Sequence, residues 1–248
     1  MDKKTIRIAR YWTTQMPNLE VNPSFQMFHK ETGSQALKTD ERITRHWISS
    51  ITRLFFRKNC DYVVYTEEDH IIGKNFETSL EAILPLFSEC QTCWTVNMGC
   101  HGDCWGLRSN YVSDVVRMES GNMGVVYSKP KFTTFLTHLE IYCDMLGDWD
   151  HNVHKMAAMG YIPSHSLTYL SPRIHHLSTC FSSRTRVVKK RNCSWEKEIK
   201  AFNRETKKSS YNLVDKGIAN YVKAHKTYSK ADTITKNRCI KAGKFYES

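Results

Sequence analysis

The chain has 248 residues, of which 40% are hydrophobic and 12% aromatic, so we expect one globular domain of ordinary size and exclude an intrinsically disordered protein. The sequence contains no run of the ~18 apolar residues that a membrane-spanning helix needs, and its first residues, MDKKTIRIAR, lack the apolar region of a signal peptide. Its 36 Lys and Arg residues outnumber its 25 Asp and Glu residues, giving a net charge of +11. Much of this charge lies in residues 184–208, a segment that can attract nucleic acid, acidic lipid or phosphorylated ligands, although a solvated helical face is the more common explanation.

The nine cysteines include three close pairs. These are Cys90 with Cys93, Cys100 with Cys104, and Cys180 with Cys193. Close pairs form disulfides in an oxidising compartment or bind zinc in a reducing one. The composition alone leaves both explanations open, although the surrounding strand and helix patterns indicate a domain that does not need zinc to fold.

The first predicted element is a strand at residues 5–8, followed by a polar loop in which two X-Pro steps disfavour helix. Thr39 with Asp40 can cap a helix that runs to residue 56, because apolar side chains recur there at helical spacing. These apolar positions are Ile43, Trp47, Ile51, Leu54 and Phe55. The run CDYVVYT, residues 60–66, is short, β-branched and apolar on both faces, which is typical of a buried strand.

The same alternation continues along the chain. We expect a helix over 75–87, a strand over 93–99, a strand from Val125, a helix over 131–146, a helix over 148–160 that ends at Gly160, and a last strand and loop within 161–177. Strands that alternate with helices favour an α/β architecture built on a largely parallel sheet. In such sheets, ligands bind beyond the carboxyl ends of the strands.

Polar residues follow the predicted strand at 60–66 at this kind of position. Glu67, Glu68, Asp69 and His70 offer the hard oxygen ligands that Mg²⁺ or Mn²⁺ prefers, and a divalent ion is a common way to hold a diphosphate. A solvated turn with acids that cap the following helix is an equally good explanation of these four residues.

Two further clusters can carry chemistry. In GDWDHNVHK, residues 147–155, an aspartate between aromatic and helical residues can be a general base, although capping of a helix N-terminus explains Asp148 and Asp150 more simply. In SPRIHHLSTC, residues 171–180, His175 and His176 can bind a metal, although paired histidines are more often surface or core residues. The sequence has no G-x-S-x-G elbow and no glycine-rich phosphate loop.

Taken in order, the runs DYVVYTEEDH, GNMGVVYSK, YCDMLGDWD and SPRIHHLSTC resemble the catalytic half of the N-acetylglucosaminyltransferase II family, over residues 38–180. The resemblance implies a GT-A (Rossmann-like) glycosyltransferase fold, with a mostly parallel central sheet flanked by helices. It also implies transfer of N-acetylglucosamine from UDP-GlcNAc to the 2-hydroxyl of a mannose on an N-glycan, with inversion and with Mn²⁺ as cofactor. Upstream of Thr5 we find no counterpart of the family's first nucleotide-binding strand.

The resemblance also implies the roles of individual residues. Asp69 and His176, rather than His175, correspond to the metal ligands, and Asp150 corresponds to the catalytic base. Asn122 corresponds to a residue that lines the substrate site. Glu67 and Glu68 are expected to face the nucleotide or to support the metal ligand.

By the same resemblance, Cys90 would pair with Cys93, Cys180 with Cys193, and Cys143 with Cys239. These pairings imply a secretory compartment. The resemblance implies the lumenal face of the Golgi membrane, with membrane association only through a segment absent from this sequence, and we expect no nucleic acid partner. We expect the catalytic domain to span residues 1–180 and a basic, polar extension, residues 181–248, to pack on it.

Two alternatives from other classes remain. One is an inactive GT-A-like domain that binds sugar or protein partners without transfer. The other is a basic module that binds zinc or nucleic acid, which would use residues 184–208 and the cysteine pairs. Aromatic side chains are not interleaved with these basic residues as a stacking platform would require, since Trp195 alone falls among them.

Overall fold

The computed structural model describes residues 39–67, 70–73, 75–99, 115–119, 121–176, 213–215 and 230–244. The predicted strand at residues 5–8, the residues before it and the basic segment 184–208 lie outside these residues.

A six-stranded sheet forms the centre of the described fold, in the order β1-β5-β3-β6-β4-β8. Its strands are β1 (Tyr62–Tyr65), β3 (Cys93–Asn97), β4 (Val115–Glu119), β5 (Val125–Ser128), β6 (His165–Tyr169) and β8 (Leu213–Asp215). A separate two-stranded sheet pairs β2 (His70–Ile72) with β7 (Ile174–His176). The α/β class predicted from the sequence is therefore confirmed.

The prediction of a mostly parallel sheet is wrong for the described strands. Only β3 with β6 and β4 with β8 run parallel, whereas β5 is antiparallel to both of its neighbours and β4 is antiparallel to β6. The physical reason is that strands consecutive along the chain are not the ones that pair: β5 is inserted between β1 and β3, β4 lies beyond β6, and both run against these strands. The alternation of strands and helices predicts parallel pairs only where consecutive strands lie side by side, and a local pattern does not record which strands do so.

The helices between residues 39 and 160 lie where the sequence pattern predicts them, whereas the last helix, Thr233–Gly243, was not predicted. The described helices are α3 (Thr39–Phe56), α4 (Phe76–Glu89), α6 (Lys129–Leu136), α7 (Leu139–Cys143), α8 (Trp149–Ala158) and α11 (Thr233–Gly243). One difference is that the helix predicted over 131–146 is two helices, α6 and α7, separated at Thr137 and His138. Gly160 follows α8 with a φ of 81°, which agrees with its predicted place at the end of that helix.

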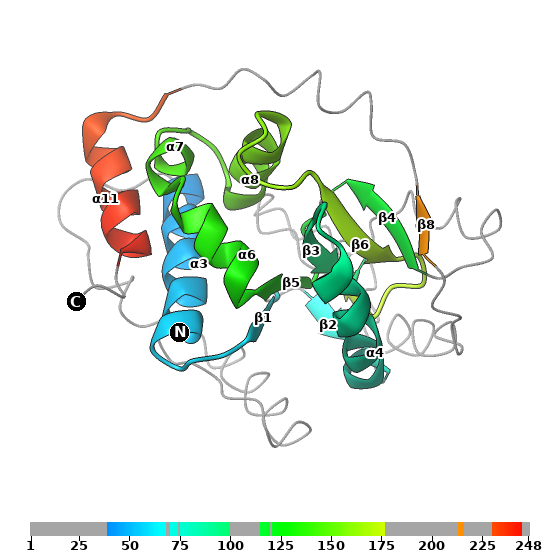
Figure 1. Cartoon of the computed structure of the whole chain (residues 1–248). Coiled ribbons are helices and arrows are strands. Elements are labelled where there is room, and N and C mark those ends of the chain that lie inside the picture. Colours follow the sequence, from blue (N-terminus) through cyan, green and yellow to red (C-terminus); the bar gives the residue numbers. More distant parts are fainter. Residues whose placement is uncertain are drawn as a thin grey trace, which may run out of the picture.

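Alternate residues of the central strands enter two separate cores. Trp94 and Tyr127 pack with α3, α6, α7 and α8 on one side of the sheet. Val126, next to Tyr127, and Val96 pack with α4 on the other side, and a register shift between Cys93 and Thr95 explains why Val96 and Trp94, two residues apart, enter different cores. Figure 1 shows α3, α6, α7 and α11 gathered beyond the β1 edge, with β8 at the far edge. The sheet is thus covered by helices on both faces.

Two of the three predicted disulfides are present among the described residues, Cys90–Cys93 and Cys143–Cys239. The third, Cys180–Cys193, lies outside them. Since the sulfurs of Cys90 and Cys93 are bonded to each other, this pair is not available as zinc ligands. The second disulfide ties α11 to the end of α7. None of the described helices combines the length and apolar character required to cross a bilayer.

Candidate active site

Asp150 lies in the first turn of α8, where both of its carboxylate oxygens accept hydrogen bonds. The side-chain amide of Asn122 donates from Nδ2 to Asp150 Oδ2 at 2.6 Å, and the backbone N–H of His151 donates to Oδ1 at 2.8 Å. The Asp150 side chain is 17% exposed, so the carboxylate is held in one orientation and still reaches solvent. The structure therefore brings together two of the residues that the sequence singled out, Asp150 and Asn122.

Glu67 joins the end of β1 to the same helix. The indole Nε1 of Trp149 donates to Glu67 Oε1 at 3.2 Å, and the backbone N–H of Glu67 donates to His70 Nδ1 at 3.1 Å. Because Nδ1 of His70 accepts this hydrogen bond, the proton of the neutral imidazole lies on Nε2. Glu67 thus connects β2 to the residue that precedes Asp150.

A cluster of aromatic rings packs next to these polar groups. Trp149 stacks on Trp47 with ring centroids 5.4 Å apart, and Tyr65 meets Trp149 edge to face at 5.1 Å. Tyr127 packs against Trp47 in the same cluster, where burial raises its pKa well above the usual range and the carboxylates of Asp150 and Glu67 act in the same direction. The phenol is therefore neutral, and this aromatic cluster carries no charge.

His176 lies on β7 directly opposite His70 on β2, and the two rings are 5.6 Å apart between centroids. Asp69, the other predicted metal ligand, precedes His70 in the sequence but lies outside the described residues, as does Glu68. His175 is paired in register with Ile71. Mn²⁺ accepts both carboxylate and imidazole ligands. His176, the described member of the predicted Asp69–His176 pair, is therefore a suitable ligand for the ion.

A second group of metal-ligating side chains surrounds Asp150. Ligand atoms of Asp148, Asp150 and His151 all lie within 4.8 Å of one another, which is compatible with a divalent ion. Nδ1 of His151 is 3.3 Å from Asp150 Oδ1 and 3.9 Å from Asp148 Oδ2. These three residues were not predicted as one metal site, although their D-x-D-H spacing within one helical turn was the available signal. An ion there would compete with the two hydrogen bonds that Asp150 already accepts.

The match to known protein families covers most of the chain. The family profile described as N-acetylglucosaminyltransferase II matches residues 40–237, which include every described side chain around Asp150, Glu67 and His176. The chain belongs to the N-acetylglucosaminyltransferase II family. A search of curated proteins gave no significant match. Membership places the chain in a glycosyltransferase family of N-glycan biosynthesis.

One buried charged residue of this N-acetylglucosaminyltransferase II family member was not predicted from the sequence. Arg173, 1% exposed, donates from Nε to Ser79 Oγ at 2.6 Å and lies over the ring of Tyr169 at 4.5 Å. The hydroxyl of Tyr169 donates to the backbone oxygen of Ser79 at 2.7 Å. These contacts attach α4 to the segment that leads into β7, and so fix the strand that carries His176.

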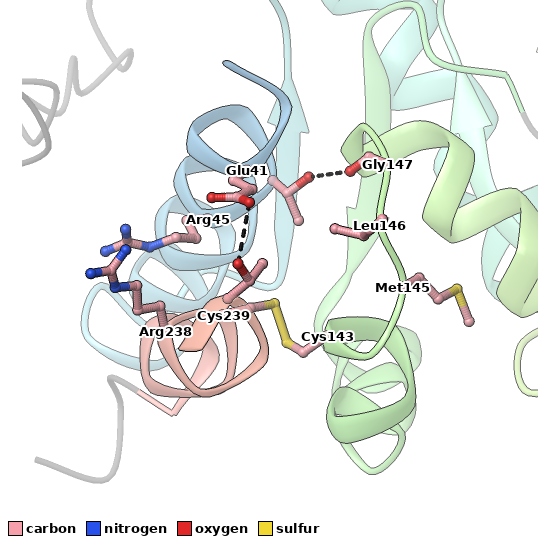
Figure 2. A pocket seen from close by; sticks show the side chains of 10 residues that line it. Glu41, Arg45, Cys143, Met145, Leu146, Gly147, Arg238 and Cys239 are labelled. Carbon is pink, nitrogen blue, oxygen red and sulfur yellow. Dashed lines mark hydrogen bonds between the residues drawn. A yellow bond between two sulfur atoms is a disulfide. The ribbon is translucent and has the colours of Figure 1, made fainter. Parts of the chain in front are cut away.

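A pocket between α3, the segment after α7 and α11 contains none of the predicted site residues (Figure 2). Thr44 Oγ1 donates to Gly147 O at 3.0 Å across it, and Thr235 Oγ1 donates to Glu41 Oε1 at 3.2 Å. The Cys143–Cys239 disulfide forms one wall. In this family member the pocket therefore marks the contact between α11 and the segment that leads to α8, at a place separate from the Asp150 carboxylate.

Proposed function

We propose that this family member is an inverting N-acetylglucosaminyltransferase that moves N-acetylglucosamine from UDP-GlcNAc to the 2-hydroxyl of a mannose on an N-glycan, forming a β-1,2 linkage. The observation that supports it most directly is the Asp150 carboxylate, held by Asn122 at 2.6 Å at the solvent-accessible start of α8. A GT-A fold, a division between residues 1–180 and 181–248, and a location in the Golgi lumen belong to the same proposal. The two described disulfides favour an oxidising compartment.

In this proposal Asp150 is the general base. The mannose hydroxyl attacks the anomeric carbon of N-acetylglucosamine, a C–O bond forms to the acceptor, and the bond from the anomeric carbon to the UDP oxygen breaks. The hydroxyl proton passes to the Asp150 carboxylate, which typically contributes a factor of ~10²–10⁴ to the rate. A single displacement inverts the anomeric centre and needs only one carboxylate for the base. Asn122 orients that carboxylate, and the same side chain is proposed to line the substrate site.

Asp69 and His176 would hold Mn²⁺ in this proposal, and the ion would supply positive charge to the departing diphosphate. Glu67 and Glu68 would face the nucleotide or support Asp69. The position of His176 opposite His70, whose neighbour in sequence is Asp69, is the structural support for this ligand pair. We favour it over Asp148, Asp150 and His151 because both oxygens of Asp150 are already hydrogen-bonded.

The base is tested by Asp150→Asn, which removes the charge and leaves the shape. We expect UDP-GlcNAc binding to be kept and transfer to a mannose acceptor to fall by ~10²–10⁴-fold. Asp144→Asn is the matched control, because Asp144 pairs with Lys236 at 3.1 Å, on the side of α11 and away from the Asn122 contact. A fully active Asp150→Asn enzyme would refute the assigned base.

The metal ligands are tested by replacing His176 and His151, one from each candidate metal site, with alanine. Calorimetric titration with UDP and Mn²⁺ should show metal-dependent binding that is lost in Asp69→Ala and His176→Ala and retained in His151→Ala. The opposite result would assign the ion to Asp148, Asp150 and His151 and would remove Asp150 from the role of base. If UDP binds with Mn²⁺ but no transfer occurs to any mannose acceptor, the alternative of an inactive sugar-binding domain replaces the proposed activity.

A further inference from the structure

The connection between β4 and β5 carries Asn122, and the residues that follow Asn122 are fixed by backbone hydrogen bonds. The N–H of Gly99 donates to the carbonyl of Met123 at 3.0 Å, and the N–H of Met98 donates to the carbonyl of Gly124 at 3.0 Å. Met123 is 4% exposed. The residue that follows Asn122 is therefore held against the end of β3.

The residue that precedes Asn122, Gly121, is held by a buried side chain, that of Asn97, the last residue of β3. With its amide oriented to satisfy both neighbours, Asn97 Oδ1 accepts from the N–H of Gly121 at 2.7 Å and Nδ2 donates to the carbonyl of Gly121 at 3.1 Å. The hydroxyl of Thr168 on β6 donates to the same Oδ1 at 3.1 Å. One side chain thus satisfies both backbone groups of Gly121, as a neighbouring strand would.

The close approach explains why glycine stands at position 121. A Cβ there would lie 2.7 Å from the nearer terminal atom of the Asn97 amide and 3.0 Å from its Cγ. Any larger residue would push the amide away and break the two-point contact. Asn97 and Gly121 therefore fit each other as a pair.

We propose that Asn97 is a positioning residue for the transfer reaction: it fixes Gly121, and thereby directs the amide of Asn122 at the Asp150 carboxylate. The proposal rests on the role of Asp150 proposed above. Asn97 is 2% exposed, so it acts through its neighbours and not by touching substrate. Asn122 lies between the Gly121 anchor and the Met123 anchor, which leaves its backbone little freedom to move.

The expected effect on catalysis follows from geometry. A displacement of about 1 Å in a reacting group can cost ~10²-fold in rate. If the loop relaxes when Asn97 is replaced, Asn122 Nδ2 no longer meets Asp150 Oδ2 at 2.6 Å and the base loses its fixed orientation. The residues proposed to hold the nucleotide and its metal, Glu67, Glu68, Asp69 and His176, lie in other parts of the sequence, so the KM for UDP-GlcNAc should change little.

The chain contains a matched control for Asn97. Thr95, two residues earlier on β3, is fully buried and shares a hydrogen bond of 2.6 Å with Ser166 Oγ on β6. Thr95→Val therefore removes a buried polar contact between the same two strands without touching Gly121. A loss of activity that only reflects a weakened sheet would appear in this variant as well.

The kinetic test compares Asn97→Leu, which has similar volume and no hydrogen-bonding group, with Thr95→Val. We expect kcat to fall about 10- to 100-fold in Asn97→Leu, with the KM for UDP-GlcNAc within about twofold of the unchanged protein. In an Asn122→Ala background, Asn97→Leu should have little further effect, because both changes remove the same contact. Full additivity, or a kcat as high as that of Thr95→Val, would overturn the inference. Gly121→Ala tests the same contact should Asn97→Leu fail to fold.

A second measurement does not depend on activity. The side-chain amide signal of Asn122 in an NMR spectrum can be assigned by its absence in Asn122→Ala. This signal should move in Asn97→Leu and Gly121→Ala and stay in place in Thr95→Val, and an unmoved signal in both of the first two variants contradicts the inference. If the protein without substitutions shows no transfer activity, or if Asp150→Asn is active, the proposed function fails. The inference about Asn97 is still tested in that case, because the amide signal reports whether Asn97 positions Asn122.

Discussion

The indole N–H of Trp149 donates a hydrogen bond to Glu67 at 3.2 Å, and this contact joins the end of β1 to the helix that carries Asp150. Trp149→Phe removes the donor and keeps an aromatic ring on Trp47. Since a hydrogen bond to a charged group is worth about 1.5–3 kcal/mol, we expect kcat/KM to fall by at least about tenfold. Steady-state kinetics of transfer, alongside the thermal midpoint of unfolding, measures this effect.

Trp94→Phe is the control for that substitution. Trp94 is 1% exposed and stacks on Phe132 in the same core, where its neighbours are the rings of Tyr127 and Phe135. The Trp94→Phe variant should lose stability without a comparable loss of kcat/KM. Equal losses of activity in the two variants would show that the ring, and not the hydrogen bond to Glu67, is what matters.

The two described disulfides should differ strongly in what they contribute to stability. Cys143–Cys239 closes a segment of 96 residues, whereas Cys90–Cys93 spans 3. In the chain-entropy account, the long loop is worth on the order of 4 kcal/mol and the short one about 2 kcal/mol at most. Urea unfolding of Cys143→Ala/Cys239→Ala and of Cys90→Ala/Cys93→Ala tests the order. A larger loss in the second variant would contradict the expectation.

Gly124 should tolerate no side chain, because it has a φ of 57° and a Cβ there would collide with Cδ1 of Ile174. Gly124→Ala combines backbone strain with overpacking, together about 2–5 kcal/mol of unfolding free energy. Ile174 begins β7, so the same variant should weaken the metal-dependent UDP binding proposed through His176.

Gly160→Ala separates the two contributions. Gly160 has a φ of 81°, but a methyl group at this position would have nothing within 4 Å, so the variant bears strain alone, about 1 kcal/mol. Urea denaturation of both variants measures the difference. Equal destabilisation would mean that the contact with Ile174 relaxes without cost.

His46 on α3 gives the protein a pH-dependent stability. Burial lowers the pKa of His46 below its usual value of 6.5, so the unfolded chain binds this proton more readily than the folded one. Stability from this group is therefore present above pH 6.5 and is lost as the pH falls through the lowered pKa. Urea unfolding between about pH 7 and pH 5 should show a steeper loss in the unchanged protein than in His46→Gln. Parallel curves would contradict this.

The local elements of the fold could be predicted from the sequence, but their order in the sheet could not. Helical spacing identified α3 and α4, and β-branched runs identified β1 and β3. β4 was missed, because its residues VVRME alternate weakly. The place of β5 between β1 and β3 depends on pairing across long stretches of chain, which no local period records.

The candidate site shows the same division. The residue pattern left a base or a capping residue open for Asp150 and favoured capping, so the roles of Asp150 and Asn122 came from the family resemblance. Their contact joins residues 28 positions apart. Asn97 and Arg173 had no sequence signal, because a buried polar side chain is recognised by the partners that satisfy it, and these come from other elements.

The position of β5 also determines when the sheet can form during synthesis. β1 and β3 precede β5 in the chain, and β5 lies between them in the sheet and pairs with both. A nascent chain that ends before Val125 therefore presents two apolar strands whose common partner has not yet been made. Pairing over such distances is slow and exposes strands to aggregation. The β1–β5–β3 part of the sheet therefore cannot form until Ser128 has left the ribosome, and its first two strands are exposed to aggregation up to that point.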